Sequence, residues 1–97
     1  MPDVHVIWDG LAFWLELKCA KSSAVKISPH QIAWHMAYYA RGGSSFFLVK
    51  SLSTGHLYLF SGEKGPDLLE KGVNGTDGAR FESLAALWDH LAARLAP

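Results

Sequence analysis

The stretch PDVHVIWDGLAFWLELK, residues 2–18, decides the fold of the N-terminal half of the chain. Its two apolar segments, residues 3–8 and 11–19, are rich in β-branched and aromatic side chains, which favour strands. Asp9 and Gly10 stand between them, and both residue types tolerate the positive φ of a two-residue hairpin turn. The stretch therefore predicts two antiparallel strands joined by a tight turn.

The turn also fixes which residues face each other across the hairpin. A two-residue turn pairs Trp8 with Leu11 and so sets Asp3 opposite Glu16. Because side chains alternate between the faces of a strand, the two carboxylates share one face with Lys18. The opposite face carries no charge, and we predict that it is the core side of the sheet. Its residues are Val4, Val6, Trp8, Leu11, Phe13, Leu15, Leu17 and Cys19.

The acidic pair on the charged face needs a positive partner. Opposed residues have Cβ atoms about 4.5–5.5 Å apart, and like charges there repel. Asp3, Glu16 and the backbone carbonyl of Leu17 form an all-oxygen half-shell of the kind that Mg²⁺ or Mn²⁺ prefers. Lys18 places an ammonium on the same face, where it can orient a water and offset charge growing on phosphorus. The pattern indicates phosphodiester hydrolysis. The alternative is a solvated strand face with no guest, since D-x(12)-E-x-K is a weak motif.

The next element is a helix with a clear start. Ser28 suits the N-cap, Pro29 the first helical position, and Gln31 the third position of a capping box. The helix should run to about Arg41, where two glycines end it. The basic segment before it, residues 21–27, has no clear period and predicts an exposed, mobile loop.

The rest of the chain predicts more strands and a last helix. The segments SFFLVKS, residues 45–51, and HLYLFS, residues 56–61, are strands around a turn at 53–55. Residues 62–80 hold five glycines and should be mostly loop, with a short helical turn at 67–71. A stripe of apolar side chains predicts an amphipathic helix packed on the sheet: Leu84, Leu87, Trp88, Leu91 and Leu95.

Composition limits the class of protein. The 97 residues, 49% of them hydrophobic, suffice for one domain with one core, and the net charge is zero. A polyanionic partner must therefore be held by local charge and a metal rather than by overall charge. No apolar run approaches the ~20 residues that cross a bilayer, and the single Cys19 demands no oxidising compartment, so we expect a cytoplasmic protein with no membrane partner. We predict one α/β domain, residues 1–97, with a mixed sheet of at least four strands flanked by helices.

Several short motifs occur in a familiar order. "PDV", "WLELK", "SPHQIAWH", "GG" and "SFFLVKS" together resemble the PD-(D/E)XK nuclease superfamily, in particular the small phage-type VRR-NUC domains related to Holliday-junction resolvases. The match runs from Pro2 to about Phe60. The resemblance implies a restriction-endonuclease-like fold that acts on DNA with Mg²⁺ (or Mn²⁺), in a bacterial or phage-infected cell.

The resemblance also implies roles for individual residues. Asp3 and Glu16 would bind the metal together with the Leu17 carbonyl, Lys18 would be the catalytic lysine, and Gln31 would lie close to the site. A capping-box Gln has a sufficient structural reason of its own. Family members usually carry a helix and a strand before the "PD" element, with an acidic residue on that helix. We expect that part to be absent here and its place to be taken by a second subunit or by the C-terminal helix.

Other polar residues have two readings each. Lys21, Lys26 and Arg41 suit a grip on DNA phosphates, or else a solvated loop and a favourable charge at a helix end. His5 and His35 lie near the expected site, with ordinary packing or solvation as the simpler interpretation. Trp34 and Tyr38 are assigned to packing.

The leading hypothesis is a metal-dependent endonuclease that cuts branched DNA, a Holliday junction or a flap, as a homodimer. The first alternative is a catalytically weak or inactive nuclease-fold module that binds DNA without cutting it. The second is a small interaction domain whose acidic pair has no guest.

Overall fold

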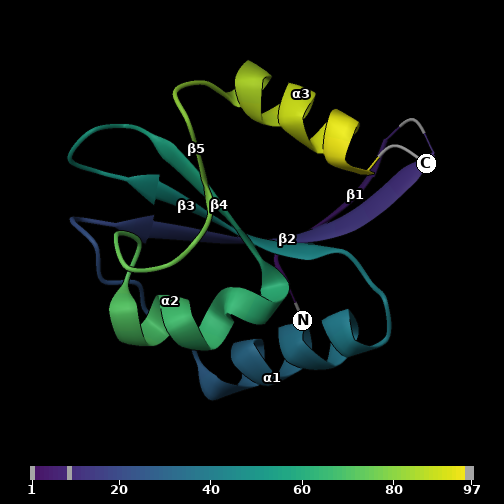
Figure 1. Ribbon diagram of the computed structural model, residues 1–97, viewed down its shortest axis with the longest axis horizontal. Helices are drawn as coiled ribbons and strands as arrows, with labels where there is room; N and C mark the ends of the chain where they lie inside the picture. The colour runs from purple at the N-terminus through teal and green to yellow at the C-terminus, as the bar shows by residue number, and fades with distance from the viewer. Residues whose placement is uncertain (1, 9, 96–97) are drawn as a thin grey trace.

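A five-stranded mixed sheet with helices on both faces forms the molecule in the computed structural model, which describes residues 2–8 and 10–95 (Figure 1). The strands lie in the order β1-β2-β3-β4-β5; β2 and β3 are parallel, and the other neighbours are antiparallel. The predicted α/β class, with a mixed sheet of at least four strands flanked by helices, is confirmed. The elements are β1 (Val4–Trp8), β2 (Leu11–Ala20), α1 (Pro29–Ala40), β3 (Ser45–Ser51), β4 (Leu57–Ser61), the 3-10 turn η1 (Gly62–Lys64), α2 (Gly65–Lys71), β5 (Ala79–Phe81) and α3 (Leu84–Leu95).

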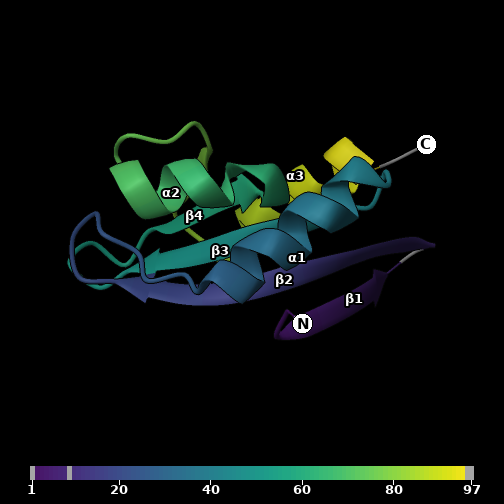
Figure 2. The ribbon, with the colours of Figure 1, turned by 90° about the horizontal axis from the view of Figure 1, so that it is seen from below.

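The N-terminal hairpin has the predicted register. Trp8 pairs with Leu11 and Val4 with Leu15, which places Asp3 directly before the first rung of the ladder. Gly10 has a φ of 79°, as the tight turn requires, while Asp9 lies outside the described residues. Figure 2 shows β1 outside β2, at the free edge of the sheet.

The sheet has a core on each face, whereas the sequence predicted one. Figure 1 shows α3 on one side of the sheet and α1 with α2 on the other. The α3 side buries Phe13, Leu15, Phe46, Leu59, Leu87 and Leu91. The α1 side buries Ala20, Val25, Ile27, Phe47, Val49, Phe60, Leu68 and Val73. The uncharged face is a core side at Phe13 and Leu15, as predicted, but the prediction of a single core is wrong, because helices cover both faces of the central strands.

Three residues that the sequence assigned to the core lie outside it. Leu17 is 47% exposed, Val4 is 37% exposed, and Cys19 is exposed, although all three were assigned to the core. The α3 cluster includes Phe13 and Leu15 but stops before Leu17, so the C-terminal end of β2 has no helix over its uncharged face. The helix α3 thus covers the face opposite Glu16 and does not shield the charged side.

The first helix begins as predicted. The Ser28 Oγ accepts a hydrogen bond from the Gln31 backbone N at 3.1 Å, and the Gln31 Oε1 accepts one from the Ser28 backbone N at 3.0 Å. Pro29 follows the cap, and Arg41 ends the helix before Gly42, whose φ is 85°. The capping box therefore fixes the direction from which α1 crosses the sheet.

The segment between β2 and α1 is anchored, which corrects the prediction of an exposed, mobile loop. Val25 and Ile27 are buried in the α1-side core. The Ser23 carbonyl accepts a hydrogen bond from the Val73 backbone N at 2.8 Å. The two lysines of this segment, Lys21 and Lys26, are exposed.

The C-terminal half contains more regular structure than predicted. The strands at 45–51 and 57–61 agree with the prediction, but residues 62–80 form η1, α2 and the start of β5 where mostly loop was expected. On α3, Leu87 and Leu91 are buried as the stripe predicted, whereas Leu84 is 54% exposed.

Candidate active site

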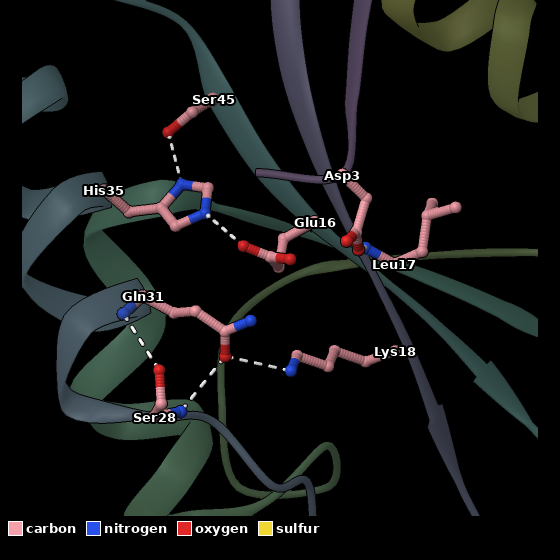
Figure 3. A network of polar contacts seen from close by, with 8 residues as sticks. All are labelled: Asp3, Glu16, Leu17, Lys18, Ser28, Gln31, His35 and Ser45. Atoms are coloured by element: carbon pink, nitrogen blue, oxygen red, sulfur yellow. Dashed lines mark hydrogen bonds and ion pairs between the residues drawn. The ribbon is translucent and has the colours of Figure 1, made fainter. Parts of the chain in front are cut away.

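The acidic pair meets at the start of the hairpin. Glu16 lies on β2 and points toward α1, where it is 1% exposed. Asp3 is exposed, and its Oδ2 accepts a hydrogen bond from the Leu17 backbone N at 2.9 Å (Figure 3). The Asp3 carboxylate thus accepts the hydrogen bond that a backbone carbonyl would accept if β1 were longer. This bond holds Asp3 beside the centre of β2.

Burial is the largest influence on the protonation of Glu16. Burial, together with a hydrogen bond to Asp3 and the negative charge of Asp3, raises the pKa of this carboxyl group from 4.5 to about 7. The positive charge of Lys18 acts against these effects. The two carboxyl groups that the sequence placed opposite each other are therefore brought together, with an excess of negative charge between them.

The backbone of Leu17 belongs to the same edge of β2. Its N–H faces Asp3, and in an extended strand the carbonyl of the same residue points to the same side. The Leu17 side chain points to the uncharged face and is half exposed. Only the peptide groups of this residue belong to the site.

Lys18 and Gln31 are joined directly. The Lys18 Nζ donates a hydrogen bond to the Gln31 Oε1 at 2.9 Å, and the same oxygen accepts the bond from the Ser28 backbone N. Lys18 is half-buried, on the same face as Glu16. Gln31 therefore caps the helix and also orients the lysine, so its structural and site roles occur together.

A buried histidine completes the helix side of the site. His35 is fully buried on α1, with its Nε2 3.4 Å from the Glu16 Oε1 and its Nδ1 2.8 Å from the Ser45 Oγ (Figure 3). Burial lowers the pKa of His35 from 6.5 to about 4, so the ring is neutral at pH 7. Because the ring is neutral, its contact with Glu16 is a hydrogen bond and not an ion pair.

Sequence reasoning named only part of this arrangement. His35 follows Gln31 by one helical turn, which is a signal that both face the sheet. Its simplest interpretation was packing or solvation, and the structure shows a packed ring with Glu16 as partner. Ser45 carried no signal in the sequence.

Aromatic rings beside the site pack on one another. His5 stacks on Trp14 with ring centroids 4.3 Å apart, and Trp34 stacks on Tyr38 at 4.8 Å. The packing role predicted for Trp34 and Tyr38 agrees with this geometry. His5 has the ordinary packing role that the simpler interpretation gave it.

Two of the three predicted DNA-binding cations lie beside Lys18. A cleft of about 540 Å³ is bordered by Lys18, Lys21 and Lys26. Small side chains and Cys19 make up the rest of its wall, and none of the described carboxylates lines it. Arg41 is at the other end of α1, about 15 Å along the helix axis from Gln31, and does not join this group.

The donor set fits a hard cation with several waters. Within residues 2–8 and 10–95, no group of three or more His, Cys, Asp and Glu side chains is arranged to hold a metal ion. The set is the Asp3 and Glu16 pair with the Leu17 carbonyl, and Mg²⁺ commonly binds through one or two carboxylates while keeping several waters. Burial and the neighbouring Asp3 raise the pKa of Glu16, and a cation bound to the pair would favour its charged form.

The wider comparisons leave the site as the guide to function. In the described ranges, no helix has both the length and the apolar character that a membrane span requires. The chain matches no protein-family model, no curated protein and no solved structure. What the molecule does must therefore be inferred from an acidic pair, an oriented lysine and a cationic cleft on one side of the sheet.

Proposed function

We propose that the chain is a divalent-metal-dependent DNA endonuclease of the PD-(D/E)XK type, with VRR-NUC-like organisation. The observation that carries the proposal is the meeting of Asp3, Glu16 and Lys18 on one side of β2. An acidic pair next to an oriented ammonium is the minimum needed to bind a cation and to stabilise charge on a phosphate.

Each residue has a distinct task in this proposal. Asp3, Glu16 and the Leu17 carbonyl would hold Mg²⁺ (or Mn²⁺), which when bound would polarise the phosphate and lower the pKa of a water. Lys18 would offset the negative charge that grows on the phosphoryl oxygens. Gln31 would keep the Lys18 ammonium beside the acidic pair through the 2.9 Å hydrogen bond.

The lysine cleft supports DNA as the substrate. Lys21 and Lys26 border the same cleft as Lys18, and contacts of lysine with phosphates position a nucleic acid without reading its sequence. Arg41 is too far along α1 to share this cleft, so it would contact a more distant phosphate. A phosphodiester held over the three lysines would lie next to the acidic pair.

A homodimer acting on branched DNA completes the proposal. The edge strand β1 is open to a partner and carries Ile7, which is 74% exposed. A two-fold assembly would present two sites to the two strands that symmetric cutting of a four-way junction requires. The exposed free thiol of Cys19 supports a reducing compartment such as the cytoplasm.

The experiment is a cleavage assay with Lys18→Ala. Labelled four-way-junction, flap and linear DNA are incubated with Mg²⁺ or Mn²⁺, and the mass in solution is measured alongside. We expect the wild type to cut a branched substrate and Lys18→Ala to lose a factor of about 10² or more, because transition-state stabilisation is removed while core contacts remain. Lys50→Ala is the control, since Lys50 is another strand lysine, exposed on β3 and away from the acidic pair. Equal cleavage by Lys18→Ala and the wild type would refute the role of Lys18.

One observation favours a second candidate function, a nuclease-fold module that binds DNA without cutting it. Glu16 is almost wholly buried, and one of its oxygens is engaged by His35. Binding of all three DNA substrates with no cleavage in either metal would favour this candidate. A small interaction domain would instead give no heat with Mn²⁺ and no rise in melting temperature, because a ligand of the folded state must stabilise it.

A further inference from the structure

A series of buried contacts supports Glu16 on the side that faces α1. It runs from Gly62, just after β4, to Ser45 on β3, to His35 on α1, and ends at the carboxyl group of Glu16. Ser45 is 4% exposed, and His35 and Glu16 are almost completely buried. Residues from three separate parts of the chain thus converge behind one carboxyl group.

The imidazole of His35 cannot rotate within this series of contacts. Each ring nitrogen is engaged, one by Glu16 and the other by Ser45. The ring also packs against Phe47 with centroids 4.3 Å apart and against Trp34 at 5.2 Å. Rotation would leave a buried polar atom without a partner, which folded proteins avoid. The ring is therefore fixed in one orientation.

Gly62 leaves the space in which Ser45 meets His35. A Cβ built at Gly62 would lie 2.2 Å from the Ser45 Oγ and 3.2 Å from the His35 Nδ1. Only a residue without a side chain lets the hydroxyl take this position. The backbone of the η1 turn is thus part of the support, although it is far from Glu16 in sequence.

We propose that His35 is a positioning residue that orients the Glu16 carboxylate for a divalent cation, with Ser45 and Gly62 fixing the ring. The hydrogen bond engages Oε1, and Figure 3 shows the second oxygen on the side of Asp3. Hydrogen bonds to the outer side of a carboxylate ligand set its direction and are needed for full metal affinity. This inference rests on the proposed function, because it takes the acidic pair to be the cation site.

Two substitutions of His35 separate its two hydrogen bonds. The amide nitrogen of Gln can reach the position of the ring Nε2, so His35→Gln keeps a donor to Glu16. The shorter Asn reaches only the position of Nδ1, so His35→Asn keeps a group near Ser45 but none at Glu16. Ser45→Ala removes the outer bond alone. His56→Ala is the control, because the His56 ring does not belong to this series of contacts.

The test measures the Kd of each folded variant for Mn²⁺ by calorimetry, without DNA, after the melting temperature is recorded. We expect His35→Asn to weaken binding about 10–100-fold, with His35→Gln closer to the wild type and His56→Ala unchanged. Ser45→Ala should weaken it less than His35→Asn. A merely structural histidine would lower the melting temperature of the Gln and Asn variants without separating their Kd values.

The outcomes distinguish this inference from the function on which it rests. If the wild type binds no Mn²⁺, the proposed metal site is wrong. If the wild type binds but His35→Asn and His35→Gln keep its Kd, the metal site stands and the positioning role is overturned. If His35→Asn does not fold, Ser45→Ala decides, and an unchanged Kd in that variant overturns the role.

Discussion

The two faces of β2 are buried in different ways. On the α3 side, Phe13 and Leu15 pack against Leu87 and Leu91, and all of these side chains are apolar. On the α1 side, a carboxyl group and an imidazole are buried among aromatic and aliphatic side chains. A buried polar group must find partners or it destabilises the fold.

This difference suggests that the α3 side mainly stabilises the fold, whereas the α1 side carries the groups that could do chemistry. The apolar face carries packing that many residue combinations could supply, whereas the α1 face carries a set of hydrogen bonds that only certain residues can make. Glu16 has its pKa raised by burial and by Asp3, and this is the kind of perturbation that occurs at functional sites.

The largest effect on stability should come from the α3 side. Leu91→Ala removes a fully buried side chain and should cost about 2–5 kcal/mol of the free energy of unfolding. Because Leu91 does not contact the acidic pair, the Mn²⁺ affinity of the folded fraction should not change. Denaturant unfolding and calorimetry measure the two quantities. A large loss of Mn²⁺ affinity in the folded variant would show that the faces are coupled.

A smaller effect should appear in the pH dependence of stability, measured without divalent ions. The raised pKa of Glu16 contributes stability that is complete below pH 4.5 and is lost as the pH rises toward 7. The lowered pKa of His35 contributes stability that is complete above pH 6.5 and is lost as the pH falls toward 4. In the wild type the two contributions oppose each other between pH 4.5 and 6.5.

Two variants should reveal the opposing contributions. In Glu16→Gln the contribution of Glu16 is missing, so the melting temperature relative to the wild type should rise as the pH goes from 4.5 to 7. In His35→Gln the contribution of His35 is missing, so the same difference should fall as the pH goes from 4 to 6.5. Thermal melts across this range are the measurement. Parallel curves for all three proteins would contradict the assignment of the two pKa values.

The smallest effect should come from the uncovered end of the apolar face. Leu17→Ser changes a side chain that is 47% exposed, so the free energy of unfolding should change by no more than about 0.5 kcal/mol. Cleavage and Mn²⁺ affinity should be retained, because only the peptide groups of Leu17 belong to the site. Chemical denaturation gives the value. A loss above 2 kcal/mol would mean that another surface covers Leu17 in solution.

Much of the fold follows from local rules in the sequence. Asp9-Gly10 fixed the hairpin and its register, and the Ser28 and Gln31 capping box fixed the start of α1. These features depend on neighbours within a few residues. The alternation of side chains along β2 also separated the charged residues from the uncharged ones correctly.

The parts that the sequence did not predict depend on contacts between distant elements. Alternation shows which side chains share a face but not which helices cover it, so the second core and the exposure of Leu17 were missed. Strand β5 has three residues, too few to show a period. The contacts of His35 with Glu16 and Ser45 join residues 19 and 10 positions away, and no local pattern encodes them.

The most direct measurement of the central claim is the position of a bound ion. Crystals of the protein soaked in Mn²⁺ would be examined by anomalous diffraction. We predict one peak between the carboxylates of Asp3 and Glu16, near the Leu17 carbonyl and next to the Lys18 ammonium. Crystals in which Mn²⁺ occupies other sites while this position stays without a peak would contradict the claim.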